Sequence, residues 1–191
     1  MEMKGIVGPS QTARDWHHTN CFGCGIDNAR GLHAEFPFDE TSGEVRFDHI
    51  PDRFQEGAPG YAHGGVLAAL LDEAQGTLCY HVGHLVMTQQ LHIKYHKATP
   101  LNQPITVRCW LTAVRKRRIY TRASIHSASG ELLASSSAGW YALPERMAQK
   151  LFADRYSAED SERNRLILEA NRKRAQKIRR RLRESIPSNQ S

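Results

Sequence analysis

Apolar residues recur at helical spacing in one segment near the middle of the chain. The pattern predicts a helix that begins near His63 and runs to about Tyr80. Its apolar positions fall on one face: Leu67, Leu70, Leu71, Ala74 and Leu78. Small uncharged residues cover the other faces near its start, so the helix is apolar nearly all round. Such a helix is buried, and in a chain this short we expect a sheet to wrap around it.

Segments on both sides of this helix alternate between apolar and polar residues, as half-buried strands do. Before the helix, short strands are expected at residues 31–38 and 43–49. After it, strands are expected at residues 90–96, 105–114, 119–126 and 132–143. Because the links between the four later strands are short, we expect them to form an antiparallel meander.

The two ends of the chain lack this strand pattern. Residues 1–20 show no periodicity and are expected to form a loose arm. After Pro144 the pattern becomes helical, with a short turn at 147–152 and a longer helix from Ser157 to about Glu184. The sequence therefore predicts an arm (1–20), a central domain (21–143) and a C-terminal basic helical extension (144–191).

The chain has 191 residues and a formal net charge of +6, most of which lies in the C-terminal extension. No aromatic residues interleave with the basic residues of its helix 158–184, so nucleic-acid binding is not expected. The longest apolar run, 66–71, is far shorter than the ~20 residues of a membrane span. No secretory signal is visible at the N-terminus, and we expect a cytoplasmic protein whose cysteines stay reduced.

Two features of the central helix are candidates for chemistry. Asp72 lies well away from the leucine face of an otherwise apolar helix, where a carboxylate is costly unless it is paired or used. Gly64 and Gly65 open the helix, and their uncovered amides could stabilise a developing oxyanion. The structural alternatives are a salt bridge for Asp72 and close helix–sheet packing for the glycines.

These residues belong to a longer pattern. The run His63-Gly64-Gly65, followed by Asp72 in the helix and Thr88 in the next strand, resembles the hotdog-fold acyl-CoA thioesterases of the PaaI/THEM type. The segment Cys21-Phe22-Gly23-Cys24-Gly25 is similar to an N-terminal motif of one branch, although Ala29 stands where that branch usually has Pro. The resemblance covers about residues 20–143.

The resemblance implies an α+β hotdog fold, an antiparallel sheet wrapped around a long central helix, and hydrolysis of acyl-CoA to free acid and CoA without a cofactor. Asp72 would be the nucleophile or the base that activates water, and Thr88 would orient Asp72 or the water. The Gly64 and Gly65 amides would hold the oxyanion, and His63 would position the thioester.

Further residues are expected to contact the substrate. Gln55 and Glu73 are candidates near the thioester. Arg115, Arg117 and Arg118 form a basic hairpin tip that could meet the phosphates of CoA. The alternative role of that tip is to protect a sheet edge against pairing.

The resemblance also implies a homodimer, or a dimer of dimers, with active sites at the dimer interface. The His-Gly-Gly end and the carboxylate can then come from opposite subunits. Two other functions of the same fold remain open: a 3-hydroxyacyl-thioester dehydratase, and a non-enzymatic acyl-CoA sensor or scaffold. The dehydratase needs a His at a loop position where this sequence has none, and a pure binder would not need Asp72.

Two features outside this set have structural explanations. Cys21 and Cys24 have the spacing of a zinc-ligand pair, but no second ligand pair of similar spacing follows. We therefore expect a structural turn over the substrate channel and no metal. For the C-terminal helix we favour an oligomer arm or a solvated arm over contact with CoA. The seam of such an oligomer arm would be the thin apolar stripe Leu168, Ala175, Ile178 and Leu182.

Overall fold

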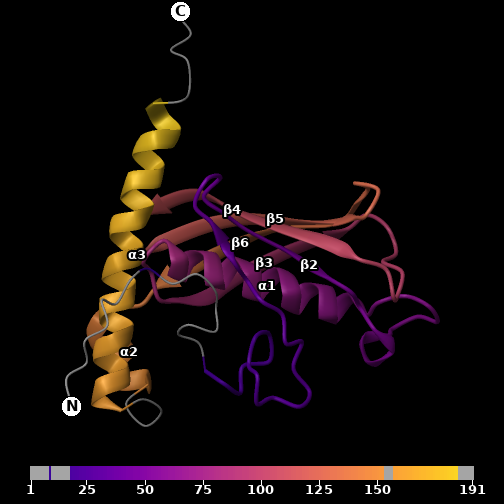
Figure 1. Ribbon diagram of the computed structural model, residues 1–191, viewed down its shortest axis with the longest axis horizontal. Helices are drawn as coiled ribbons and strands as arrows, with labels where there is room; N and C mark the ends of the chain where they lie inside the picture. Colours follow the sequence, from indigo (N-terminus) through magenta and orange to yellow (C-terminus); the bar gives the residue numbers. More distant parts are fainter. Residues whose placement is uncertain (1–8, 10–17, 153–156, 185–191) are drawn as a thin grey trace, which may run out of the picture.

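The computed structural model describes residues 9, 18–152 and 157–184, and its centre is one antiparallel sheet that curves around a helix (Figure 1). The strands are β1 (Phe38–Asp39), β2 (Glu44–His49), β3 (Val86–Tyr95), β4 (Ile105–Arg115), β5 (Arg118–Ser127) and β6 (Leu132–Ala142). The helices are the short η2 (Arg53–Gln55), α1 (Gly64–His81), α2 (Glu145–Phe152) and α3 (Ala158–Glu184). None of the described helices combines the length and the hydropathy that a membrane crossing requires.

The central helix α1 is buried as its pattern predicts, and it also carries one buried polar anchor. Its leucines pack in the main core with no exposed surface at Leu70, Leu71 and Leu78. Gln75, equally buried, donates to Ser136 Oγ on β6 (2.8 Å) and accepts from Thr121 Oγ1 on β5 (2.8 Å). Because a buried polar group must be satisfied, this pair of bonds fixes the rotation of α1 against the sheet.

The strand prediction for residues 31–38 is largely wrong. Leu32, Ala34 and Phe36 are buried in alternation, but only Phe38 and Asp39 pair as a strand. The backbone amides of Leu32 and Ala34 instead donate to carbonyls of the preceding cysteine loop, at 2.7 and 2.9 Å. The apolar alternation of residues 31–38 therefore predicted correctly which side chains are buried. It did not predict that their backbone amides bond to a loop instead of a neighbouring strand.

The expected meander is only partly confirmed, because β3 does not pair with β4. The strand order is β1-β2-β4-β5-β6-β3, so β4, β5 and β6 form the meander and β3 lies at the far edge beside β6. The link from β3 to β4 is held against the loop before α1, where Ala62 N donates to Thr99 O and Leu101 N to Gly60 O. The link from β3 to β4 thus passes the N-terminal end of α1, and β4 does not return beside β3.

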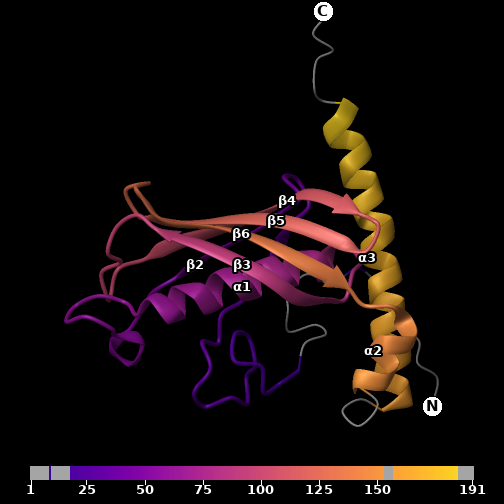
Figure 2. The ribbon, with the colours of Figure 1, turned by 180° about the vertical axis from the view of Figure 1, so that it is seen from behind.

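The basic helix α3 is docked on the domain, at the end of the sheet where α1 terminates (Figures 1 and 2). Its side chains donate to the last carbonyls of α1 and its turn: Asn171 to Tyr80 O (3.0 Å), Arg174 to His81 O (3.3 Å) and Arg172 to Gly83 O (3.2 Å). Those carbonyls have no partner inside a helix and carry the negative end of its dipole. Basic and amide side chains of α3 therefore cap the C-terminal end of α1.

This docking corrects both favoured roles of the extension. The helix is not a solvated arm, because Asn171 and Arg174 are buried against α1. The proposed oligomer seam is wrong for Ala175 and Ile178, which belong to the main core of the same chain. The side chain of Leu182 lies outside the described residues, as does most of the expected N-terminal arm.

Candidate active site

The structure brings Asp72 and Thr88 together. Asp72 is half-buried on α1, and Thr88 Oγ1 on β3 donates to its Oδ1 at 3.2 Å. Burial raises the pKa of Asp72 above its ordinary value, the Thr88 hydrogen bond lowers it in part, and the negative charge of Glu73 raises it further. A carboxylate that is desolvated and still solvent-reachable is a stronger base than one in water.

A bulge in β3 directs Thr88 toward the helix. Tyr95 and Ile93, at odd-numbered positions, contact α1 or the core, so strict alternation would turn Thr88 to the opposite face. The register of β3 with β6 shifts between Thr88 and Gln90, which inserts Gln89 as an extra residue. This bulge reverses the alternation, and bulges are common beside active sites for this reason.

The N-terminus of α1 presents one amide that is not engaged. His63 is the N-cap, and its Nδ1 accepts from the amide of Gly65 at 2.9 Å, while its carbonyl accepts from Val66 at 2.9 Å. The Gly64 carbonyl accepts from Tyr95 Oη at 2.8 Å. Within the described part of the chain, the Gly64 amide has no acceptor. Of the two predicted oxyanion donors, Gly64 is thus the available one, and Gly65 is held by His63.

The helix terminus and the carboxylate do not meet within one chain. Gly64 and Asp72 are on the same straight helix, and at 1.5 Å per residue their backbones are about 12 Å apart. A hydrogen bond to an oxyanion needs a donor at about 3 Å, and the attacking water needs its base equally close. One thioester carbonyl cannot satisfy both groups of the same chain.

Gln55 supports the helix terminus. Its carbonyl accepts from the amide of His63 at 2.7 Å, and its side-chain Oε1 accepts from His49 Nε2 at 2.8 Å. These two bonds position the residue that caps α1. A direct contact of Gln55 with substrate stays a prediction.

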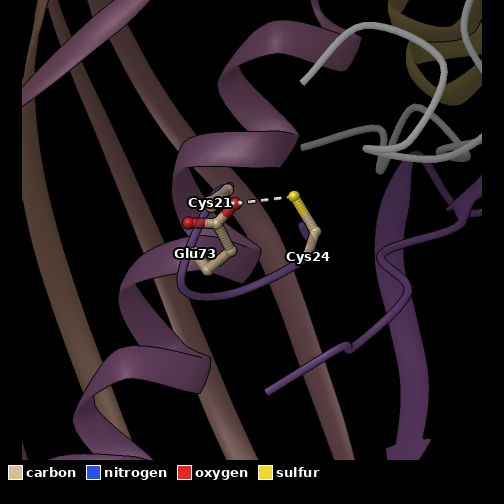
Figure 3. Close-up of side chains that lie close together, drawn as sticks. All are labelled: Cys21, Cys24 and Glu73. Atoms are coloured by element: carbon tan, nitrogen blue, oxygen red, sulfur yellow. Dashed lines mark hydrogen bonds between the residues drawn. The ribbon is translucent and has the colours of Figure 1, made fainter. Parts of the chain in front are cut away.

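Glu73 and its neighbour Asp72 have different hydrogen-bond partners. The thiols of Cys21 and Cys24 donate to its Oε1 at 3.4 and 3.5 Å (Figure 3). The pKa of the Cys24 thiol is raised far above its usual range by hydrogen bonding with Cys21, by burial and by the charge of Glu73. With no cation among these groups, Cys24 therefore stays protonated and is a poor nucleophile. No pattern in the sequence predicts this contact, and a substrate role of Glu73 stays a prediction.

The basic hairpin lies at the same end of the sheet as Thr88. Arg115 pairs with Arg118, Arg118 with Tyr141, and Tyr141 with Met87, the neighbour of Thr88. At about 4.8 Å per strand, Arg118 on β5 is about 10 Å from β3. Arg115, Arg117 and Arg118 are all exposed, and their contact with CoA stays a prediction.

A hollow of about 1380 Å³ extends from the Asp72–Thr88 pair toward α3. Its walls come from α1, from the ends of β3 and β6, and from α3, and they include Thr77, Tyr80, Trp140, Leu168 and Arg172. The contribution of α3 to these walls was not expected from the sequence. An amphipathic pattern shows which face of a helix is apolar, but it does not show which element that face meets.

Comparison with known proteins supports the hotdog fold. Residues 59–134, which include His63, Asp72 and Thr88, match the family model of the Thioesterase superfamily. This part of the chain is therefore similar to that superfamily, and the sheet around α1 is a hotdog fold. The crystal structure of a thioesterase superfamily protein matches the hotdog domain at 32% identity and a TM-score of 0.61, over 65% of this chain and 61% of that chain.

Two other proteins show the range of the likeness. Acyl-coenzyme A thioesterase THEM5 of Homo sapiens is 28% identical over 89 residues, which are 47% of this chain and 36% of that protein. A hypothetical thioesterase protein with coenzyme A from Streptococcus pneumoniae TIGR4 is 21% identical with a TM-score of 0.52, over 55% of this chain and 84% of that chain. The match to THEM5 thus spans about a third of the human protein's length, and the pneumococcal structure supports the hotdog fold alone.

Proposed function

We propose that this protein hydrolyses acyl-CoA thioesters to a free acid and CoA. The observation that carries the proposal is the Asp72–Thr88 pair, a desolvated carboxylate oriented by a hydroxyl at the mouth of a large hollow. The superfamily match and the name of the human relative support the same reaction class.

In the proposed reaction Asp72 takes a proton from a water molecule, which attacks the thioester carbonyl. Thr88 holds the carboxylate by the hydrogen bond to Oδ1. The Gly64 amide, at the positive end of the α1 dipole, donates to the oxyanion of the tetrahedral intermediate. The intermediate then collapses, the carbon–sulfur bond breaks and the CoA thiolate leaves. A thiolate is a good leaving group, so little protonation is needed in this step.

We propose that each active site combines residues of two chains. The separation of about 12 Å between Gly64 and Asp72 supports this, because one carbonyl needs both groups. The edge strand β3 supports it as well: it is ten residues long and mostly exposed, and among the described strands it pairs only with β6. Long exposed edges favour pairing with another strand, here that of a second copy. A homodimer, or a dimer of dimers, is therefore part of the proposal.

We assign the acyl group to the hollow between α1, β6 and α3. Its lining is mixed, with Tyr80, Trp140 and Leu168 among the apolar contributors. The basic tip at Arg115, Arg117 and Arg118 is proposed to meet the phosphates of CoA, a ligand that the pneumococcal neighbour holds. The cytoplasm remains the expected compartment, as part of this proposal.

The experiment that tests the reaction is thiol release from a panel of short-chain, long-chain and aryl acyl-CoAs. The wild type is compared with Asp72→Asn, and with Asp48→Asn, which changes an exposed carboxylate on β2. We expect hydrolysis that falls by ~10²-fold or more only in Asp72→Asn. Absence of hydrolysis with every acyl-CoA, in a wild type that binds acyl-CoA, would contradict the proposal and favour a sensor.

A further inference from the structure

The loop that carries Cys21 and Cys24 lies against the middle of α1, where it meets Glu73 (Figure 3). Two sulfur atoms and one carboxylate oxygen lie within 4.8 Å of one another, and they come from segments about 50 positions apart in the chain. We propose that Cys21, Cys24 and Glu73 bind a zinc ion. No metal is expected here from the sequence, because no second ligand pair follows the cysteines. In the structure the third ligand comes from α1.

The spacing of the three atoms fits a tetrahedral zinc ion. Zinc–sulfur bonds of about 2.3 Å and a zinc–oxygen bond of about 2.0 Å place the sulfur and oxygen ligands about 3.5 Å apart. The observed distances from Glu73 Oε1 are 3.4 Å to Cys21 Sγ and 3.5 Å to Cys24 Sγ. An ion at the centre of the group needs no large movement of its ligands.

The loop itself is built like a metal-binding knuckle. The amide of Gly23 donates to Cys21 Sγ at 3.3 Å, and such bonds stabilise a sulfur that carries negative charge. The amide of Gly25 donates to Cys21 O at 3.0 Å and closes the turn. A Cβ atom on Gly25 would lie 2.4 Å from the backbone of Cys21, and one on Gly23 would lie 2.4 Å from Glu73 Cγ. Both glycines are therefore required for the sulfurs to reach the helix.

The ligand set selects the class of ion. Thiolates favour zinc and other borderline or soft ions over magnesium and calcium, which take oxygen ligands. Cys21 and Glu73 are half-buried and Cys24 is buried, so the site is close to the surface. Among the described residues these three make up the group, and a tetrahedral zinc ion takes one ligand more.

The position in the fold points to a structural ion. Glu73 turns toward the cysteine loop, while Asp72, its neighbour in the chain, turns toward Thr88. The ion would fasten residues 21–25 to α1 beside the candidate base without contacting it. Metal binding of this kind adds its binding free energy to the stability of the fold. This inference stands independently of the proposed hydrolysis.

The test uses the full chain, purified without chelator, with elemental analysis and Co²⁺ as a spectroscopic probe. We expect about one equivalent of zinc in the wild type, and thiolate-to-cobalt charge-transfer absorption when Co²⁺ is added to the protein after zinc removal. Cys24→Ser and Glu73→Gln should each weaken cobalt binding by about tenfold or more. Asp72→Asn, which changes the neighbouring carboxylate, should keep the full spectrum.

Two outcomes would overturn the inference. A folded wild type with no bound metal and no cobalt–thiolate absorption would mean that the thiols only donate hydrogen bonds to Glu73. A cobalt spectrum that persists in the Cys21→Ser/Cys24→Ser double variant would place the metal elsewhere. If the variants do not fold, the wild-type spectrum alone decides. Because metal binding is read without substrate, a failed hydrolysis assay would leave this result unaffected.

Discussion

At the scale of single residues, the surroundings of Asp72 that suit its proposed role as a base also lower the stability of the fold. Its pKa is raised mainly because α1 desolvates it. A carboxyl whose pKa is higher in the folded state than in the unfolded chain favours folding below the unfolded pKa, and this contribution is lost as the pH rises through the folded pKa. At neutral pH the ionised Asp72 therefore costs stability, a common property of catalytic groups.

The first prediction concerns the charge of Asp72. Asp72→Asn keeps the shape of the side chain and removes the desolvated charge, so thermal unfolding at pH 7 should show a midpoint equal to or above that of the wild type. At the same time hydrolysis should fall by ~10²-fold or more. A variant that is clearly less stable than the wild type would show that Asp72 has a structural role instead.

The second prediction concerns the hydrogen bond from Thr88. This bond lowers the pKa of Asp72, so Thr88→Val should raise it further and move the acid limb of the kcat/KM profile to higher pH. Thr88→Ser keeps the hydroxyl and should keep the limb near its wild-type position. The pH–rate profile of the three proteins is the measurement, and an unmoved limb in Thr88→Val would separate Thr88 from the base.

The sequence allowed the central residues to be named but not their surroundings. Asp72, Thr88 and Gly64 were named through the resemblance to a thioesterase family, and their roles in catalysis stay predictions. The bulge at Gln89 and the contact of Glu73 with the cysteines depend on the register of strands and on a loop about 50 residues away. Local periodicity contains no information about such contacts.

At the scale of elements, the two ends of α1 have opposite tasks. Its N-terminus keeps the Gly64 amide available, and its C-terminus is capped by the basic and amide side chains of α3. The central helix itself was predictable because its apolar pattern spans almost its whole length. The docking of α3 was not, because the residues that make it, Asn171 and Arg174, are polar and buried.

The third prediction isolates the Gly64 amide. Proline fits the first position of a helix, and the extended backbone of His63 (φ −64°, ψ 134°) is compatible with a following proline. Gly64→Pro should thus keep α1 while a ring carbon replaces the N–H hydrogen, lowering kcat by ~10²–10³. Gly64→Ala keeps the N–H, and its Cβ would meet Tyr95 at an ordinary 3.4 Å. Equal kcat values for the proline and alanine variants would remove Gly64 from the oxyanion site.

The fourth prediction concerns the docking of α3. Arg174 donates to His81 and Asn171, reaches Glu40 at 3.3 Å and lies over the ring of Phe38. Arg174→Ala leaves buried acceptors without a donor and should lower the free energy of unfolding by about 2–4 kcal/mol.

The matched control for Arg174→Ala is its neighbour on the same helix. Lys173 is exposed and, among the described residues, pairs with Glu169 in the preceding turn, so Lys173→Ala should change the free energy of unfolding by less than about 0.5 kcal/mol. Denaturant titration measures both variants. Equal effects of the two substitutions would contradict the capping role of Arg174.

At the scale of the whole molecule, the positions of Gly64 and Asp72 are the reason for the proposed assembly. Gly64 and Asp72 are at different turns of one straight helix, and β3 offers an unpaired edge. In a two-fold dimer each site would take Gly64 from one chain and Asp72 from the other. Sequence alone could suggest this arrangement only through resemblance to a family, whereas the distance along α1 supplies a physical reason.

The most direct test of this account is hydrolysis by a mixed dimer. Co-expression of Asp72→Asn with Gly64→Pro gives heterodimers in which one site regains both groups and the other lacks both. Random pairing of equal amounts should restore about a quarter of the wild-type specific activity, although each variant alone is nearly inactive. No activity above that of the separate variants, in a dimer shown to contain both chains, would contradict the shared site.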